Sequence, residues 1–329
     1  DTATASTKGP INNNNIYYQY HSATSNQNFG YHAGYSEGIL SKIDYSNDTV
    51  NAAVAGGALS HGYGGSTSRY DAAALSRKGQ GAPDTSNISP VATNFGYFGG
   101  GGNPSVLSRV DRVDYSNDTA TAITKGPLSV GRKFLAATSS SFFGYFGGGG
   151  APEKSTVDRV DYTNDTATAV AKGSLSTIRE KLVATGNSSF GYFAGGQTPS
   201  TVSTVDRVDY GNDTATASPK GPLSVARWAV AATGNSSFGY FAGGGPGSKS
   251  TVDRIDYSND TATAVAKGPL SSARKYLGGA GNASFGYFGG GSAPSASPSR
   301  VSTVERIDYG NDTATAVAKG PLTAGKYFI

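Results

Sequence analysis

The chain contains 329 residues with a formal net charge of +4, and its 27 basic and 23 acidic residues are mixed along the whole length. No basic block stands out, so the sequence does not predict a nucleic-acid-binding surface. The absence of cysteine excludes disulfides and zinc–cysteine sites, and no apolar run approaches the length of a membrane span.

Two phrases recur along the chain at a nearly constant interval. Close copies of FGYFGGG stand at 95–101, 143–149, 190–196, 238–244 and 285–291, with the divergent copy FGYHAGY at 29–35. DYSNDTATA and its variants place their second aspartate at 48, 118, 165, 213, 260 and 312. The tyrosines of the first phrase are 47 or 48 residues apart, except for one interval of 66 residues. Such regularity argues against disorder, and the 47 glycines keep no collagen-like period.

One unit, residues 222–268, divides into four short extended segments. RWAVAAT is followed by the turn GNSS, FGYFAGG by a Gly/Pro/Ser loop, TVDRIDY by the turn SND, and the unit ends with TATAVAKG. The third segment alternates its two side-chain faces, as a strand does, and the Asn and Asp of the turns suit turn backbone. Four strands in a unit of about 47 residues, repeated around a ring, predict an all-β propeller of four-stranded blades.

The unit resembles the Kelch repeat, on the elements GYFGGG, VERIDY and GPLSSAR. The resemblance covers nearly the whole chain, although the tryptophan usual in the fourth strand of that family is replaced by alanine and valine. It implies a Kelch-like propeller in which FGYFGGG is one strand of each blade, with aromatic rings packing between blades. The form STVDRIDYSNDTATA…GPLS…GYFGGG also resembles repeat proteins of marine bacteriophages, which are thought to be virion components.

We expect a single propeller domain over residues 1–329, as part of a longer chain, with an irregular blade or insertion at 58–93. Residues 62–79 read as a degenerate copy of strands two to four. A fourth strand at 1–9 and a first strand at 325–329 would flank the regular blades. This count favours seven blades, and six blades with a long insertion is the alternative.

Sequence variation is concentrated in the loops after strand two and in the links from strand four to the next blade. In a four-stranded antiparallel blade both lie on one face, and binding loops on a rigid scaffold produce this pattern. Aromatic and cationic side chains in the links could stack on a sugar or hold an acidic group. The candidate ligand-binding residues are Lys133, Phe134, Arg179, Arg227, Trp228, Lys275 and Tyr276.

Two other interpretations of these residues stay open. The aromatic side chains could pack between blades, and the repeated arginines could pair with carboxylates such as Asp111 or Asp158 rather than cradle an anionic ligand.

The residues Asp256, Asn259 and Asp260 of one turn favour an Asx turn over a calcium site. Asn-Asp-Thr in the same turns would be a glycan acceptor only in a eukaryotic secretory route.

Catalytic chemistry is poorly supported. The only histidines are His21, His32 and His61, all in the irregular N-terminal third, and the carboxylates are alike in every blade. We therefore expect a non-enzymatic module without cofactor or metal, exposed on a virion or another extracellular surface. It would be part of a fibre or receptor-binding appendage that recognises a host glycan or another structural protein through the variable face. A purely architectural component and a carbohydrate-active enzyme are the alternatives.

Overall fold

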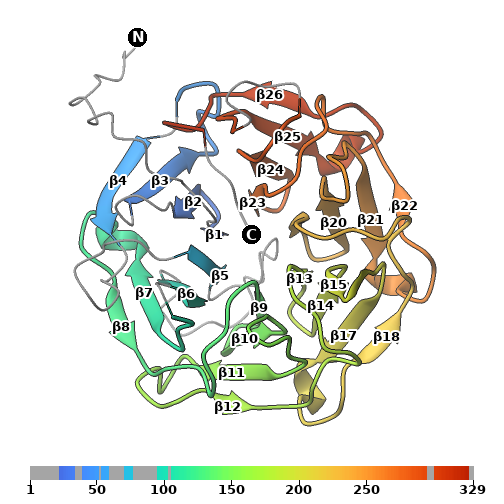
Figure 1. The fold of residues 1–329 in the computed structure, drawn as a ribbon. Helices are drawn as coiled ribbons and strands as arrows, with labels where there is room; N and C mark the ends of the chain where they lie inside the picture. Colours follow the sequence, from blue (N-terminus) through green and yellow to red (C-terminus); the bar gives the residue numbers. More distant parts are fainter. Residues whose placement is uncertain are drawn as a thin grey trace.

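The chain forms a ring of six four-stranded antiparallel sheets, the blades of a β-propeller (Figure 1). In this computed structural model the described residues are 22–33, 39–51, 53–58, 70–76, 95–102, 105–294 and 300–325. The all-β propeller predicted from the repeat is confirmed. Within each blade the strands pair in chain order, so that the first strand is innermost and the fourth is outermost.

The first blade consists of β1 (Ser22–Ser25), β2 (Phe29–Ala33), β3 (Ile39–Asp44) and β4 (Ala53–Ala58). The second consists of β5 (Tyr70–Ser76), β6 (Phe95–Gly102), β7 (Val110–Asp114) and β8 (Ile123–Lys125). The third consists of β9 (Ala136–Ser139), β10 (Phe143–Gly147), β11 (Val157–Asp161) and β12 (Val170–Ala171). The fourth blade consists of β13 (Val183–Gly186), β14 (Phe190–Ala194), β17 (Val205–Asp209) and β18 (Ser218–Lys220). The fifth consists of β19 (Ala231–Gly234), β20 (Phe238–Ala242), β21 (Val252–Asp256) and β22 (Val265–Ala266). The sixth consists of β23 (Gly278–Gly281), β24 (Phe285–Gly289), β25 (Val304–Asp308) and β26 (Val317–Lys319). A small hairpin in the fourth blade consists of β15 (Gln197–Thr198) and β16 (Ser200–Thr201). Single 3-10 turns follow the third strand in η1 (Tyr115–Asn117), η2 (Tyr210–Asn212), η3 (Tyr257–Asn259) and η4 (Tyr309–Asn311).

The blade count is six, not the favoured seven. Tyr70–Ser76, which the sequence suggested as part of an extra blade, forms β5, the innermost strand of the second blade. It pairs with β6 so that Ala74 lies opposite Phe98. The second FGYF strand needs an inner partner for its backbone, and this segment supplies it.

Parts of the earlier expectation lie outside the described residues. These are residues 59–69 and 77–93 of the 58–93 interval, and the flanking segments 1–9 and 326–329.

The tyrosine of each FGYF strand stacks on a tyrosine of the next blade. Tyr145 in β10 lies over Tyr210 with the ring centroids 4.7 Å apart and the planes 14° apart. The same contact joins all six pairs of neighbouring blades, in Tyr31–Tyr115, Tyr97–Tyr162, Tyr145–Tyr210, Tyr192–Tyr257, Tyr240–Tyr309 and Tyr287–Tyr45. The prediction that these aromatic residues pack between blades is confirmed.

In the third and fourth blades the second phenylalanine of the phrase packs against a glycine of the preceding blade, and in the fifth and sixth blades it shares a buried cluster with an alanine there, Ala194 or Ala242. Phe146 is fully buried, and a Cβ on Gly99 in β6 would lie 2.5 Å from its ring. The close approach of strand and ring at this boundary therefore leaves no room for a side chain on Gly99. In the first blade His32 takes this place and is also fully buried, beside Gly289 of the sixth blade.

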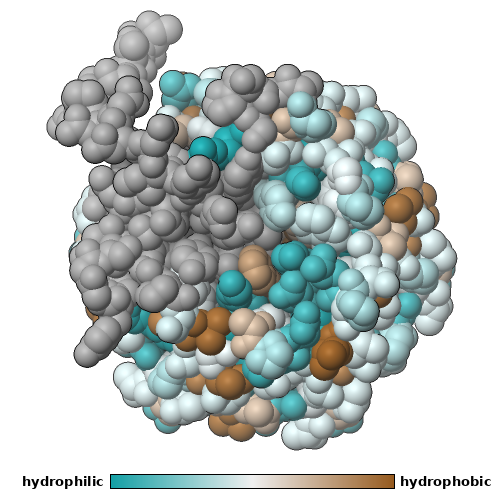
Figure 2. Space-filling view, in the orientation of Figure 1, coloured by the Kyte–Doolittle hydropathy of each residue, from teal (hydrophilic) through white to brown (hydrophobic). Residues whose placement is uncertain are grey.

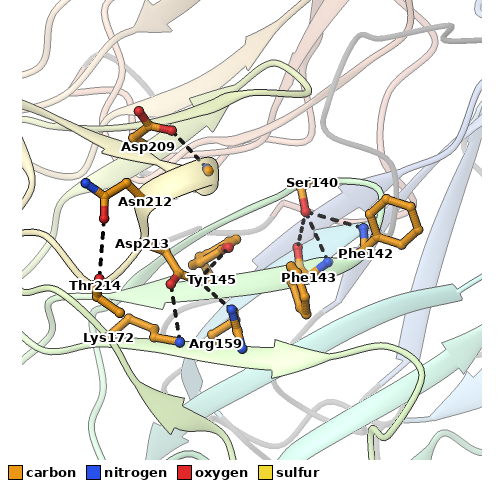
Figure 3. A network of polar contacts seen from close by, with 11 residues as sticks. Ser140, Phe142, Phe143, Tyr145, Arg159, Lys172, Asp209, Asn212, Asp213 and Thr214 are labelled. Carbon is orange, nitrogen blue, oxygen red and sulfur yellow. Dashed lines mark hydrogen bonds and ion pairs between the residues drawn. The ribbon is translucent and has the colours of Figure 1, made fainter.

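A polar contact centred on an aspartate recurs between each blade and the next. Asp213, in the turn after β17, accepts hydrogen bonds from the hydroxyl of Tyr145 at 3.0 Å and from Nη1 of Arg159 at 2.8 Å (Figure 3). Nζ of Lys172 lies 3.3 Å from its other oxygen. The three donors belong to the third blade and Asp213 to the fourth, so we call this cluster a latch. The other latch aspartates are Asp48, Asp118, Asp165, Asp260 and Asp312.

The ring closes through the latch of Asp48. The sixth and first blades come from opposite ends of the chain, yet β23 lies beside β1 (Figure 1). Asp48 accepts hydrogen bonds from Tyr287 at 2.8 Å and from Arg306 at 2.7 Å, and Lys319 lies 3.2 Å away. Side-chain contacts of the same kind as between other blades therefore join the two ends.

Candidate binding site at the channel mouth

The inter-blade links and the loops after each second strand meet on one face. The backbone N–H of Arg179, in the link to the fourth blade, donates to the carbonyl of Lys154 in the preceding loop at 3.1 Å. Equivalent bonds join Arg227 to Val202 and Arg274 to Lys249. The face with variable loops is thus assembled as the strand order predicted. On the face drawn in Figure 2, a group of hydrophilic residues lies just to the right of the centre.

Four link residues adopt the left-handed conformation at the channel mouth. Phe134, Lys181, Ala229 and Tyr276 have φ values of 58°, 54°, 53° and 61°. A backbone hydrogen bond runs from each to the one before, with N–O distances of 2.9, 3.0 and 3.0 Å. Residues other than glycine rarely adopt this conformation, and such strain is concentrated at functional sites. We call these four residues the belt. Their hydrogen bonds hold the links of the third to sixth blades in fixed positions relative to one another.

The predicted arginines lie inside the blades beneath this belt. Arg227 is fully buried, and its Nη2 donates to Asp253 at 2.7 Å while its Nη1 donates to the carbonyl of Gly243 at 2.8 Å. Burial lowers the pKa of the Arg227 guanidinium, and the charge of Asp253 opposes that shift. Arg179 forms the same pair with Asp206 at 2.7 Å. Neither guanidinium reaches the surface, so their part is to position the links.

The pairing of these arginines with carboxylates is confirmed for one of the two aspartates named from the sequence. Arg132 donates to Asp158 at 2.9 Å, and both side chains are fully buried. The other aspartate, Asp111, lies 3.9 Å from Arg109 instead.

The other predicted residues form one arc of alternating cations and rings. Nζ of Lys133 lies 5.0 Å from the ring centre of Phe134, and Nζ of Lys181 lies 5.2 Å from the same ring and 5.3 Å from that of Trp228. Nζ of Lys275 lies 5.3 Å from the Trp228 ring. These are cation–π distances, at which an aromatic face attracts an ammonium group.

Tyr276 completes the arc, which we call the mouth arc and define as Lys133, Phe134, Lys181, Trp228, Lys275 and Tyr276. Its ring meets Trp228 edge to face at a centroid distance of 5.5 Å, and Lys275 lies 5.4 Å from its centre. All six side chains are half-buried. The structure thus brings five of the seven predicted residues together at the surface.

Trp228 differs from the other two aromatic residues of the arc in its place within its link. Trp228 does not occupy the place of Phe134 and Tyr276, because the left-handed residue of its link is Ala229. Trp228 instead pairs with the loop at Gly245, as Lys275 pairs with Ser292. Its indole packs against that glycine, where an added Cβ would lie 3.0 Å away.

Lys181 was missed by the sequence analysis. It takes the left-handed place of its link, and its ion pair with Glu180 has an N–O distance of 3.2 Å. The signal was the position of Lys181 two residues after Arg179, matching that of Phe134 after Arg132.

A small cavity lies at the centre of the ring, next to the arc. Its volume is about 70 Å³, and the inner strands of all six blades contribute alanine, glycine, valine and leucine to its wall. Leu135, Leu182, Ala229 and Leu277 in that wall each directly follow a residue of the mouth arc. The cavity therefore continues the mouth inward as a lining without charged side chains.

Among the described residues, the arc has three ammonium groups beside its aromatic rings, and the carboxylate of Glu180 forms an ion pair with one of them, Lys181. Such a surface attracts anions.

Within the described residues no group of three or more His, Asp or Glu side chains is placed to hold a metal ion. None of the helices in this described part of the chain is long and apolar enough to cross a membrane. The Asx-turn reading is confirmed, since Asp256 accepts from the backbone N–H of Ser258 at 2.9 Å.

No protein family matches the sequence, and no curated protein matches it.

Proposed function

We propose that the chain is a non-enzymatic binding module that recognises an acidic glycan at the mouth arc. The observation that carries this proposal is the placement of Lys133, Lys181 and Lys275 around the rings of Phe134, Trp228 and Tyr276. An ammonium group held by a ring keeps its charge available to an incoming carboxylate or sulfate while losing little side-chain freedom.

Lys275 is the central contact in this proposal. It approaches both Trp228 and Tyr276, and in the described residues no carboxylate forms an ion pair with it. Lys181, by contrast, is partly neutralised by Glu180. An anionic group therefore gains most by binding near Lys275. The packing of Trp228 on Gly245 means that its ring serves mainly to orient the two lysines that flank it.

The setting of the module follows from the resemblances in the sequence. We place it in a Kelch-like protein of a virion or another extracellular surface, within a fibre or receptor-binding appendage. The repeat phrases, the one-sided variation of the loops and the binding surface at the mouth support that setting. The partner is a host glycan, and other structural proteins of the assembly contact the remaining surfaces.

A glycan array with matched acidic and neutral members tests the function. The unmodified chain should bind acidic members, Lys275→Met and Trp228→Ala should lose most of that binding, and Lys249→Met should retain it. Lys249 lies in the loop between β20 and β21 of the fifth blade, so the control removes the same charge outside the mouth arc. Equal binding by Lys275→Met and the unmodified chain would overturn the proposal.

An architectural role is the second candidate, and one observation favours it. The six latches and six tyrosine stacks repeat with little change around the ring, which suits a rigid building block. The absence of any array signal, together with stoichiometric assembly with other structural proteins, would favour this role.

A further inference from the structure

We propose that the central cavity accepts a short acyl group of the ligand whose acidic group binds the mouth arc. The ligand class is then an acidic sugar that carries an N-acyl or O-acyl substituent. This inference rests on the proposed function, and the experiment below separates the two.

The first step is the chemistry of the cavity. The side chains in its wall are alanine, glycine, valine and leucine, contributed by all six inner strands. Of these, Ala137, Val183 and Gly279 are partly buried. Ala137 and Val183 also pack against buried clusters between the blades, and Gly279 lies against the backbone of Ala232. These side chains share the wall with polar backbone groups of the inner strands. The space therefore suits an acyl group, which offers a methyl group and a carbonyl, and disfavours a carboxylate, whose charge would lose its hydration.

The second step is size. A volume of about 70 Å³ corresponds to about five water-sized spheres on the same measure. An acetyl group has three heavy atoms and enters such a space, whereas a whole sugar ring does not. The cavity therefore suits a substituent of the ligand rather than its ring.

The third step is continuity between cavity and mouth. Ala229 in the cavity wall directly follows Trp228, and Leu277 directly follows Tyr276. The belt of left-handed residues fixes these links relative to one another. One small ligand can thus place an anionic group near Lys275 and an acyl group against the inner strands at the same time.

Three related sugars test the inference by titration calorimetry. N-acetylneuraminic acid carries both groups, its deaminated analogue has a hydroxyl in place of the acetamido group, and its methyl ester lacks the negative charge. We expect N-acetylneuraminic acid to bind about fivefold more tightly than the deaminated analogue, the gain from burying one to two methyl-sized groups. We expect the methyl ester to bind at least about tenfold more weakly, because the charge-assisted contact with Lys275 is lost.

The outcomes separate the inference from the proposed function. Equal binding of N-acetylneuraminic acid and its deaminated analogue would overturn the acyl site and leave the acidic-glycan function standing. Equal binding of the acid and its ester would overturn the acidic-glycan function. A lack of binding by all three sugars would overturn the inference, and the glycan array would then decide the function alone.

Cavity variants give an independent readout. Ala137→Val should reduce the affinity for N-acetylneuraminic acid to that for the deaminated analogue, whose own affinity should not change. Val183→Ala enlarges the same cavity and should keep the preference, and Ala74→Val replaces Ala137→Val if that variant unfolds. An acyl preference that survives filling at Ala137 and at Ala74 would contradict the cavity as its source.

Discussion

Tyr145 donates its hydroxyl hydrogen to a carboxylate oxygen of Asp213 at 3.0 Å, across the boundary between two blades. The residues stand 68 positions apart in the sequence. Arg159 and Lys172 contact the same carboxylate, so one aspartate collects three donors from the neighbouring blade. The same three kinds of donor contact Asp48, Asp165, Asp260 and Asp312, whereas Asp118 is contacted by Tyr31 and Lys42. Each blade is therefore fastened to the next by a carboxylate that accepts from a tyrosine and pairs with a cation.

We expect Asp213→Asn to lower the free energy of unfolding by about 2 kcal/mol, because Arg159 and Lys172 lose their partly buried counterion. Tyr145→Phe should cost about 1 kcal/mol, since only one hydrogen bond is lost. Urea unfolding followed by tyrosine fluorescence measures both. A smaller loss for Asp213→Asn than for Tyr145→Phe would contradict the central role of the carboxylate.

The closing latch should be more sensitive to opening than an internal one. No peptide link joins the sixth blade to the first within the ring, whereas the third and fourth blades are joined covalently. Asp48→Asn should therefore speed amide hydrogen exchange in β1 and β23 by about tenfold or more, because local opening there needs no global unfolding. Asp213→Asn is the matched control and should leave exchange in β1 and β23 unchanged.

The buried pair of Arg227 and Asp253 gives a third prediction. Asp253→Asn leaves a buried guanidinium without a counterion and should destabilise the protein by about 3–5 kcal/mol. Adding Arg227→Met removes that charge and should restore part of the loss. Thermal unfolding of the two single variants and the double variant measures the coupling, and strict additivity of the two losses would argue against a paired charge.

Stability should fall steeply at alkaline pH. Burial, followed by the charge and hydrogen bond of Asp213, raises the pKa of Tyr145 well above its ordinary value of 10.0, and burial raises that of Tyr210 as well. Because the folded pKa is the higher one, this stabilisation is fully present below pH 10 and is lost as the pH rises through and above that value. The unfolding temperature should hold between pH 7 and 9 and fall above pH 10. Absorbance showing that all 20 tyrosines ionise before the folded signal is lost would contradict burial of these phenols.

Two glycines with similar backbone angles should respond differently to alanine. Gly243 and Gly247 have φ values of +70° and +61°. A Cβ on Gly243 would lie 2.5 Å from Leu277 and 2.6 Å from the carbonyl of Arg274, whereas a Cβ on Gly247 would meet nothing within 4 Å. Gly247→Ala should therefore cost about 1 kcal/mol from backbone strain alone. Gly243→Ala should cost about 3 kcal/mol, because a steric clash is added. Equal losses in chemical denaturation would show that the contacts of Gly243 relax freely.

The repeat and its aromatic phrase could be predicted from the sequence because their signal is local. The period of 47–48 residues, the alternation in TVDRIDY and the turn residues each require only neighbours along the chain. The number of blades depended on which strand pairs with which. The sequence of Tyr70–Ser76 resembles neither a regular inner strand nor a regular middle strand. Its pairing with β6 shows that it is the inner strand of the second blade.

The sequence by itself determined the propeller, the four strands of a blade and the face on which variable segments gather, because periodic apolar and turn residues encode them. Only the tertiary structure decided that Arg179 and Arg227 are buried in carboxylate pairs, that Lys181 belongs to the mouth arc, and that each latch joins two blades. Those contacts connect segments many residues apart. Their partners follow from how the blades close into a ring, which no local pattern of residues records.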